Sequence, residues 1–294
     1  MKIWNQYQKP ATVDEALGYL STAKGSTAVI GGGTDLLLDI RQGRHSAVEV
    51  MVDIAGVDEM CTLKLDGEHI VLGASVTHNE IVHSDLLKQN AECVVEGCGL
   101  IGGPQVRNVA TIGGNVAHAL PAGDGTISLL AMNTEVQIAS PEGRRWEPLE
   151  DIFAGPGKPT FDRAREILVA FRFIKSQQGE ASAFHRIMRP QGVAIAILNM
   201  AAWVKLDENG SIADVRISVG PAGPRPLRAH QTEAALKGRS YDEAAFQEAC
   251  KVLDGEVSLR TSAHRATKEY RHKMIPVLLK RVLDTAVSRS KQQG

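Results

Sequence analysis

The chain has 294 residues, and its 33 lysines and arginines nearly balance its 34 aspartates and glutamates. Basic residues form no block and are not interleaved with aromatic ones, which argues against a nucleic-acid-binding protein. The longest apolar run, over residues 193–203, is interrupted by Asn199 and is shorter than the roughly 20 residues that span a bilayer. We therefore predict no membrane span and, because residues 1–6 contain no apolar signal region, a cytoplasmic location.

The first part of the chain, residues 1–55, is predicted to form a small lobe of helices and strands. Thr12 precedes acidic residues and leucines at helical spacing, which predicts a helix over residues 12–20. Further along, Val29 and Ile30 end a predicted strand. Residues 35–41 are predicted to form a short helix, and residues 48–54 a strand rich in β-branched side chains.

The loop between the first strand and the short helix contains three consecutive glycines, Gly31, Gly32 and Gly33, followed by Thr34 and Asp35. Without Cβ atoms, this backbone can approach a ligand closely and adopt positive φ angles. A cap by Thr34 or Asp35 would leave free N–H groups at the positive end of the helix, which suits a phosphate or diphosphate. The loop has neither the Lys-Ser/Thr ending of a P-loop nor G-x-G-x-x-G spacing, so alone it is equally consistent with a tight turn that binds nothing.

Residues 56–176 are predicted to form a second lobe. Two strands flank the turn Asp66-Gly67, residues 155–159 form a rigid loop, and the polar residues 175–180 form a linker to the next unit. The remaining predicted elements are helices over residues 78–83, 91–100 and 127–132, and strands over residues 62–65, 69–72, 135–139 and 167–173.

A second glycine segment lies within this lobe, over residues 104–125. Gly113 and Gly114 form a predicted bend between the hydroxyl of Thr111 and the amide of Asn115, and Asp124 follows with a carboxylate. Two such bends could close on one diphosphate from opposite sides and donate backbone N–H groups without any lysine or arginine. The sequence therefore predicts that the two glycine segments meet in space.

Residues 181–294 are predicted to form a third unit, of α+β type, with no evident chemistry of its own. Two strands, over residues 193–206 and 212–219, flank residues 207–210, whose Asn-Gly pair is a strong hairpin signal. A helix is predicted over residues 241–253. A terminal helix carries one apolar stripe, formed by Ile275, Leu278, Leu279, Val282 and Leu283.

Together, G-G-G-T-D-L-L at residues 31–37 and P-Q-V-R-N-V-A-T-I-G-G-N at residues 104–115 resemble the FAD-binding medium subunit of the molybdenum hydroxylases. This group includes xanthine dehydrogenase, carbon monoxide dehydrogenase and nicotinate dehydrogenase, and the resemblance covers essentially the whole chain. It implies an α+β fold, with a two-lobed PCMH-type FAD-binding domain followed by a C-terminal α+β domain like that of the CO dehydrogenase flavoproteins.

The resemblance also implies cofactors and partners. FAD would bind to this chain, a large partner subunit would hold a molybdenum cofactor, and a small partner subunit would hold two [2Fe-2S] clusters. The chain is too short to contain all of these parts. The expected assembly is therefore a heterotrimer, which the family suggests dimerises.

The residues expected around FAD come from the glycine segments and from positions that match the family. Glycine N–H groups and the hydroxyls of Thr34 and Thr111 would contact the diphosphate, whereas Asp35 would accept loop or helix N–H bonds because a carboxylate repels phosphate. The full set is Val29, Ile30, Gly31, Gly32, Gly33, Thr34, Asp35, Leu36, Ile101, Gly102, Val106, Ala110, Thr111, Gly113, Gly114, Asn115, His118, Gly123, Asp124, Leu168 and His185.

Several of these residues have more specific expected roles. Asn115 and Asp124 would hydrogen-bond ribityl or ribose hydroxyls, and Leu168 would contact the flavin ring. The match at His185 is looser, because family members often carry lysine there. For His185, a hydrogen-bonded surface histidine stays open as the alternative.

Metal sites and cysteine chemistry are not indicated. Cys61, Cys93, Cys98 and Cys250 form no C-x-x-C pair, so they are expected to be reduced and mostly buried thiols and not cluster ligands. The nine histidines show no metal-binding spacing, and G-x-S-x-G is absent. We predict neither a metal ligand nor a catalytic acid or base in this chain.

The sequence thus predicts an electron-transfer subunit, similar to the medium subunit of xanthine dehydrogenase. It would take electrons from the [2Fe-2S] clusters of a small subunit and pass them through FAD to NAD⁺ or another acceptor. Two alternatives stay open: a stand-alone FAD-dependent oxidoreductase that binds its own organic substrate, and an interaction subunit that holds no cofactor.

Overall fold

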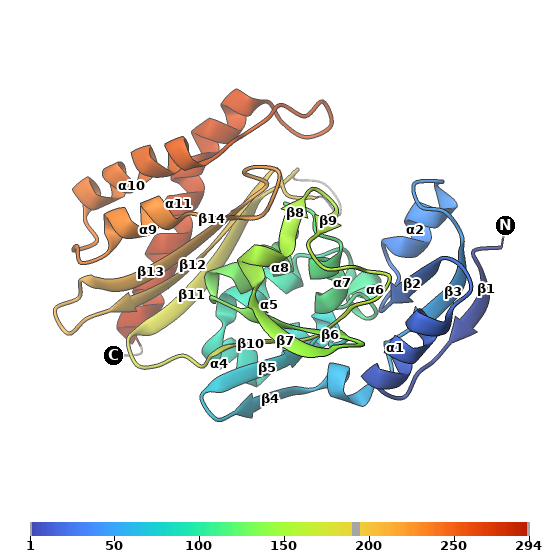
Figure 1. The fold of residues 1–294 in the computed structure, drawn as a ribbon. Helices are drawn as coiled ribbons and strands as arrows, with labels where there is room; N and C mark the ends of the chain where they lie inside the picture. Colours follow the sequence, from blue (N-terminus) through green and yellow to red (C-terminus); the bar gives the residue numbers. More distant parts are fainter. Residues whose placement is uncertain (1, 190–194, 293–294) are drawn as a thin grey trace.

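The computed structural model describes residues 2–189 and 195–292, which form three main sheets and one two-stranded pair, with their helices (Figure 1). The first sheet is parallel, with the order β1 (Trp4–Gln8), β3 (Val48–Asp53), β2 (Thr27–Ile30). Helices α1 (Val13–Thr22) and α2 (Leu36–Arg41) belong to this lobe. As predicted, Thr12 caps α1: its hydroxyl accepts a hydrogen bond from the N–H of Glu15.

The central strand of this lobe, β3, is buried on both faces. Val50 and Val52 pack with α1 and with the core of the second lobe, whereas Met51, on the opposite face, packs with Ile40 of α2. Because side chains alternate across a strand, one short apolar run joins two layers. Through β3 and α1, the first lobe is attached to the second.

The second sheet is antiparallel, with the strand order β4-β5-β10-β6-β7. Its strands are β4 (Leu63–Asp66), β5 (His69–Gly73), β6 (Glu135–Ser140), β7 (Gly143–Pro148) and β10 (Ile167–Ile174). The helices of this lobe are α3 (His78–His83), α4 (Asp85–Asn90), α5 (Glu92–Gly99), α6 (Pro104–Arg107), α7 (Ile112–Ala117) and α8 (Asp124–Ala131). Two 3₁₀ turns (Asp58–Cys61 and Leu149–Ile152) and the small pair β8 (Phe153–Gly155) and β9 (Lys158–Pro159) complete the lobe.

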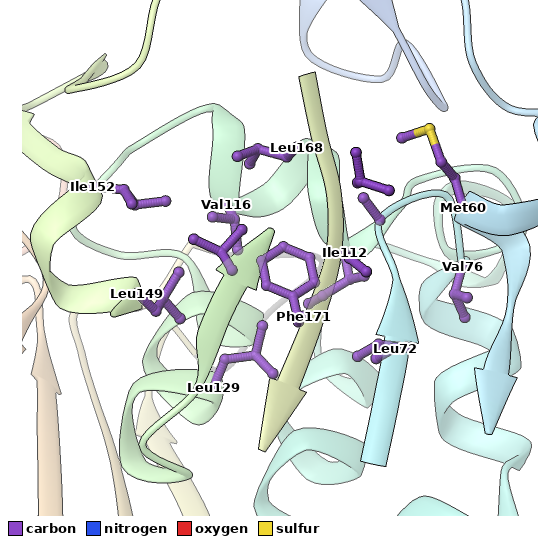
Figure 2. Close-up of a cluster of buried hydrophobic side chains, with 14 of the residues drawn as sticks. Met60, Leu72, Val76, Ile112, Val116, Leu129, Leu149, Ile152, Leu168 and Phe171 are labelled. Atoms are coloured by element: carbon purple, nitrogen blue, oxygen red, sulfur yellow. The ribbon is translucent and has the colours of Figure 1, made fainter. Parts of the chain in front are cut away.

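The core of the second lobe anchors the second glycine segment. Figure 2 shows Ile112 and Val116 of α7 beside Phe171 of β10, and all three side chains are buried. Full burial of side chains of this kind contributes about 1.5–3 kcal/mol each. These buried contacts therefore fix the helix that carries Gly113 and Gly114 against strand β10.

The C-terminal domain has one antiparallel sheet with the order β11 (Glu180–Ile187), β12 (Leu198–Leu206), β13 (Ile212–Gly220), β14 (Leu227–Arg228). Its helices are α9 (His230–Leu236), α10 (Glu243–Glu256) and α11 (Lys268–Gln292). Along β12, Met200 and Ala202 pack in the core formed with α9, α10 and α11, whereas Ala201 and Trp203 join the core of the second lobe. The sheet is thus covered on both faces, which explains the continuous apolar sequence of β12.

Most of the predicted elements are confirmed, including the α+β class, the hairpin between β12 and β13 and the buried stripe of α11. The elements that the sequence analysis did not predict include β1, α4, α6, α7, α9, β7, β11 and β14 (Leu227–Arg228). The strand predicted over residues 193–206 begins at Leu198, and residues 193 and 194 lie outside the described residues. The predicted linker ends before Glu180, which is buried in β11 and receives a hydrogen bond from Lys205.

Two further predictions are corrected. The rigid loop at residues 155–159 contains part of the β8-β9 pair. Cys93 and Cys98 are fully buried and Cys250 is half-buried, but Cys61 is exposed. Burial raises the pKa of Cys93 to about 12, so its thiol stays protonated at neutral pH.

Within the described residues, no helix is long and apolar enough to cross a membrane. The same part of the chain contains no group of three or more histidines, cysteines, aspartates or glutamates arranged to hold a metal ion.

Candidate functional site

A large cleft runs between the first lobe, the second lobe and the C-terminal domain, with a volume of about 1490 Å³. This exceeds the roughly 300–1,000 Å³ of most small-molecule pockets. Twenty of the 21 residues that the sequence predicts around a cofactor line this cleft, and His185 is the exception. Residues far apart in the chain are therefore brought to one site.

The two glycine segments are in direct contact. A Cβ atom added to Gly32 would lie 1.9 Å from the carbonyl oxygen of Val109, and one added to Gly31 would lie 2.9 Å from Oγ1 of Thr111. Contacts this short leave no room for a side chain, so the glycines allow one segment to lie on the other. The predicted meeting of the segments is confirmed, and the diphosphate between them stays a prediction.

The first glycine loop carries unpaired backbone donors. The N–H groups of Gly32, Gly33 and Thr34 donate no hydrogen bond to any described part of the chain. Gly33 has a φ angle of +68°, a conformation that favours glycine. This loop can therefore offer its N–H groups to an anion in the cleft.

The second glycine pair is not a bend but the first turn of α7, with Thr111 as its N-cap. The Gly113 N–H donates to the carbonyl oxygen of Ala74 at 2.8 Å, and the Gly114 N–H donates to Oγ1 of Thr111 at 3.1 Å. The prediction that this segment donates glycine N–H groups to a diphosphate is therefore wrong for this structure. The hydroxyl of Thr111 keeps its own hydrogen, which it can donate to a ligand.

The two glycines of this turn differ in their surroundings. A Cβ on Gly113 would lie 2.5 Å from the carbonyl oxygen of Ala74, whereas one on Gly114 would meet only Oγ1 of Thr111, at 3.2 Å. Gly113 is thus required where α7 packs on the chain after β5. Gly114 borders the cleft and leaves space there for a ligand.

Asp35 does not have its expected role. It occupies the N-cap position of α2 but accepts no capping hydrogen bond. Its carboxylate instead lies 3.7 Å from Nδ1 of His118, and that of Asp39 lies 3.9 Å from Nε2 of the same histidine. His118 is in the second lobe, so α2 and the end of α7 lie close to each other at the cleft.

A buried ion pair between Arg186 and Asp124 lines the cleft. Asp124 accepts a hydrogen bond from Arg186 through one carboxylate oxygen and from Asn199 through the other, the latter at 2.6 Å. Burial raises the pKa of Asp124, and the charge of Arg186 opposes that effect. Each carboxylate oxygen has a second lone pair, so a ligand hydroxyl can still donate to Asp124.

Asn115 connects two helices next to this pair. Its side-chain oxygen accepts hydrogen bonds from the N–H and from Oγ1 of Thr126, both at 3.0 Å. Its amide nitrogen has no partner within the described residues. Asn115 can therefore hold α7 on α8 and still donate to a ligand hydroxyl.

His185 lies outside the cleft, contrary to the prediction. Its ring packs toward α11, where Nε2 lies 3.3 Å from Oγ1 of Thr285, and burial lowers its pKa. The next residue, Arg186, points to the opposite face of β11 because side chains alternate along a strand. Arg186 is thus the residue of this strand that lines the cleft.

Other cleft residues were missed by the sequence analysis. His78 is buried, with 1% of its surface exposed, and its Nδ1 has no partner within the described residues. Burial lowers its pKa from 6.5 to about 4, and the nearby charge of Arg107 acts in the same direction. The C-terminal domain contributes Arg260, Arg265 and Arg271. The one available signal was the density of basic residues between α10 and α11.

The residues of the cleft fit an extended dinucleotide such as FAD. The unpaired N–H groups of the first glycine loop suit a diphosphate, and the orphaned Nδ1 of His78 is a further polar contact. Ile101, Val106 and Leu168 give the cleft apolar walls suited to a flat ring. The fold and the cleft together define a two-lobed cofactor-binding protein with a third, covering domain.

Comparison with known proteins agrees with this class. Residues 3–173 match the family described as "FAD binding domain in molybdopterin dehydrogenase", and residues 182–286 match "CO dehydrogenase flavoprotein C-terminal domain". The chain therefore belongs to the family of FAD-binding medium subunits of the molybdenum hydroxylases, which are oxidoreductases.

Relatives match along their whole length. The chain is 28% identical to a putative xanthine dehydrogenase FAD-binding subunit of Escherichia coli over 96% of both chains. It is 27% identical to the carbon monoxide dehydrogenase medium chain of Hydrogenophaga pseudoflava over 97% of both chains. A solved carbon monoxide dehydrogenase structure from the same organism superposes with a TM-score of 0.92 at 26% identity, and the match covers 98% of this chain and 99% of that one.

Proposed function

We propose that this chain holds FAD between its two N-terminal lobes and is the electron-exit subunit of a larger dehydrogenase. The observation that carries the proposal is the contact between the two glycine segments, beside the unpaired N–H groups of Gly32, Gly33 and Thr34. When bound, FAD accepts electrons singly and delivers them as a pair.

The proposed role of the protein is to hold and orient the cofactor. The first glycine loop and the hydroxyl of Thr111 would hold the diphosphate, while Asn115 and Asp124 would hold hydroxyl groups. Ile101 and Leu168 would contact the ring and exclude water from it. No side chain has to move a proton, which agrees with the absence of a predicted catalytic residue.

The partner chains belong to the proposal as well. A carbon monoxide dehydrogenase medium chain and a xanthine dehydrogenase FAD-binding subunit are by name parts of larger assemblies. We propose a molybdenum-containing large subunit, a small subunit with [2Fe-2S] clusters, a dimer of such heterotrimers and a cytoplasmic location. NAD⁺ or another acceptor would take the electrons.

The division of the chain into domains of residues 1–55, 56–176 and 181–294 also stays a prediction.

The direct test is flavin content. In the native complex we expect flavin absorption bands and one FAD for each copy of this chain. Gly114→Val should lower FAD occupancy and leave the fold intact, because Gly114 borders the cleft and meets only Thr111. Gly18→Val is the matched control, since Gly18 lies exposed on α1 with no neighbouring atom within 4 Å of an added Cβ.

Three outcomes would contradict the proposal. A colourless native protein would support the interaction subunit that holds no cofactor. An isolated chain that oxidises an organic substrate without partners would support the stand-alone oxidoreductase. Full occupancy in Gly114→Val, with the variant correctly folded, would place the flavin elsewhere on the molecule.

A further inference from the structure

The segment of residues 121–124, which leads into α8 and lines the cleft, is held by the C-terminal domain. Asn199 of β12 donates from its side-chain amide to the carbonyl oxygen of Ala122 at 3.2 Å. A Cβ atom added to Gly220, at the end of β13, would lie 2.2 Å from the carbonyl oxygen of Pro121. The C-terminal domain therefore lies directly against this part of the cleft, with no room for a side chain between them.

Two neighbouring strands of the C-terminal domain supply the donors to Asp124. Arg186 of β11 and Asn199 of β12 are directly opposite in the antiparallel pairing, so their side chains lie on the same face of the sheet. Arg186 donates to Oδ2 of Asp124, and Asn199 donates to Oδ1 at 2.6 Å. A second N–H group of Arg186 donates to Sδ of Met188 at 2.9 Å. The carboxylate is thus fixed at both oxygens and cannot turn without breaking one of its two bonds.

The C-terminal domain also holds the rest of α8, which lies beside β12 and β13 (Figure 1). Oγ of Ser218 donates to the carbonyl oxygen of Ile127 at 2.6 Å, and Arg216 donates to that of Met132 at 3.4 Å. These contacts run along the helix to its end. Asp124, the first residue of α8, therefore keeps a fixed position relative to the C-terminal sheet.

The ionisation of Asp124 depends on the same donors. Burial raises its pKa, whereas the charge of Arg186 and the hydrogen bonds from Arg186 and Asn199 oppose that effect. Cys98 of α5 also lies near Asp124, but burial raises the pKa of its thiol, which stays neutral. An ionised carboxylate is the stronger acceptor for a ligand hydroxyl. Without Arg186, the buried carboxyl group would take up a proton more readily.

We propose that Arg186 and Asn199 are positioning residues of the cofactor site, which act through Asp124 by fixing the carboxylate that holds a cofactor hydroxyl group. The C-terminal domain is then part of the cofactor site and not only its cover. This role rests on the proposed function, in which Asp124 holds a hydroxyl group of FAD.

The test is titration of the native complex, after removal of its flavin, with FAD from about pH 5 to about pH 9. Arg186→Met should bind FAD at least about tenfold more weakly at neutral pH. Its affinity should rise with pH through a midpoint at least about one pH unit above that of the unchanged chain, because Asp124 must ionise without a neighbouring positive charge. Arg186→Lys keeps that charge and should restore the midpoint. Asn199→Leu should weaken binding with a smaller shift of the midpoint.

Arg228→Met is the matched control. Arg228 forms a buried ion pair with Glu233 in the same domain, but it is not among the residues that line the cleft. The variant should lose stability because Glu233 is left buried without its partner. Its FAD affinity should keep the pH midpoint of the unchanged chain.

A double-variant cycle separates positioning from support of the fold. Asp124→Asn leaves Arg186 buried without a carboxylate, so the free energy of unfolding should fall, and Asp124→Asn/Arg186→Met should regain part of that loss. The double variant should nevertheless bind FAD as weakly as Asp124→Asn alone, because Arg186 acts through Asp124. This comparison remains decisive even where Arg186→Met alone does not fold.

Unchanged FAD affinity and an unchanged midpoint in Arg186→Met would overturn the assignment of Arg186. So would a further loss of affinity when Arg186→Met is added to Asp124→Asn, because Arg186 would then contact the cofactor itself. Recovery of FAD affinity together with stability in the double variant would show that the pair supports only the fold. A native complex that binds no FAD would contradict the proposed function and this role together, whereas the three preceding results, with FAD bound to the unchanged chain, would contradict this role alone.

Discussion

The two glycine segments look alike in sequence but do different things in the structure. Residues 31–33 form a loop whose N–H groups are unpaired, whereas Gly113 and Gly114 begin a helix and use their N–H groups within the protein. In the first segment, the absence of side chains lets a loop lie on a neighbouring carbonyl group. In the second, it lets a helix lie on Ala74 and keeps space free at Gly114.

This difference shows that glycine pairs cannot be interpreted by composition alone. A glycine at a site of close approach serves packing when its neighbour is the chain itself, and binding when its neighbour is empty space. Here Gly32 and Gly113 serve packing, and Gly114 borders the ligand space. Substitutions in the two segments should therefore have separable effects.

Gly32→Val should have the largest effect. Its side chain would overlap the carbonyl oxygen of Val109, 1.9 Å from the added Cβ, and would force the two segments apart. We expect a loss of about 3 kcal/mol or more in the free energy of unfolding, together with loss of flavin. Denaturant unfolding and the visible spectrum measure these two effects. A stable variant with full flavin would show that the contact between the segments is dispensable.

His78 should make the free energy of unfolding depend on pH, because its imidazole is buried beside the second glycine segment. Its backbone N–H donates to Ala110, and its pKa is lowered from 6.5 to about 4. As pH falls below 6.5, the unfolded chain takes up the proton first, so the free energy of unfolding falls until about pH 4. Between pH 7 and pH 5 this contribution is about 2 kcal/mol.

The His78→Leu variant should therefore lose about 2 kcal/mol less than the unchanged chain between pH 7 and pH 5. His83→Leu, at the exposed end of the same helix, is the control for removal of a histidine. Denaturant titrations at the two pH values measure the difference. Identical acid sensitivity in the unchanged chain and His78→Leu would contradict the assignment.

Thr111→Val tests the helix cap in the second segment. The valine keeps the shape of the side chain but cannot accept the Gly114 N–H, so we expect a loss of about 1 kcal/mol in the free energy of unfolding. Flavin affinity should fall too, because the same hydroxyl is available to the diphosphate. The Thr111→Ser variant should restore both properties, and equal behaviour of the two variants would exclude a role for the hydroxyl.

Gly114→Ala should have the smallest effect on stability. The added Cβ would meet only Oγ1 of Thr111, and alanine favours the helix by roughly 0.5–1 kcal/mol over glycine. We expect the free energy of unfolding to change by less than about 1 kcal/mol while FAD binds more weakly. Thermal unfolding followed with and without FAD separates these effects. A large loss of stability would show that Gly114 serves packing, like Gly113.

Much of the fold could be predicted because its signals are local. The capping hydroxyl of Thr12, the hairpin at Asn209-Gly210 and the apolar stripe of α11 each lie within one element. Residues near the two glycine segments could also be assigned, since the resemblance covers both. Of the 21 residues predicted from these local and family signals, 20 line the cleft in the structure.

The rest depended on contacts that no local pattern contains. β11 was missed, so the face on which its side chains lie could not be predicted, and His185 was chosen in place of its neighbour Arg186. The use of the Gly113 N–H depends on Ala74, which lies in another part of the chain. The cleft residues Arg260, Arg265 and Arg271 come from the C-terminal domain, whose strand β12 packs against the second lobe through contacts distant in the sequence.

The central claim is that the first glycine loop, laid on the second segment, holds the diphosphate of FAD. A crystal structure of the native complex with its flavin tests this claim most directly. The account predicts phosphate oxygens at about 3 Å from the backbone nitrogens of Gly32, Gly33 and Thr34. A diphosphate bound anywhere else, with those N–H groups facing only water, would contradict it.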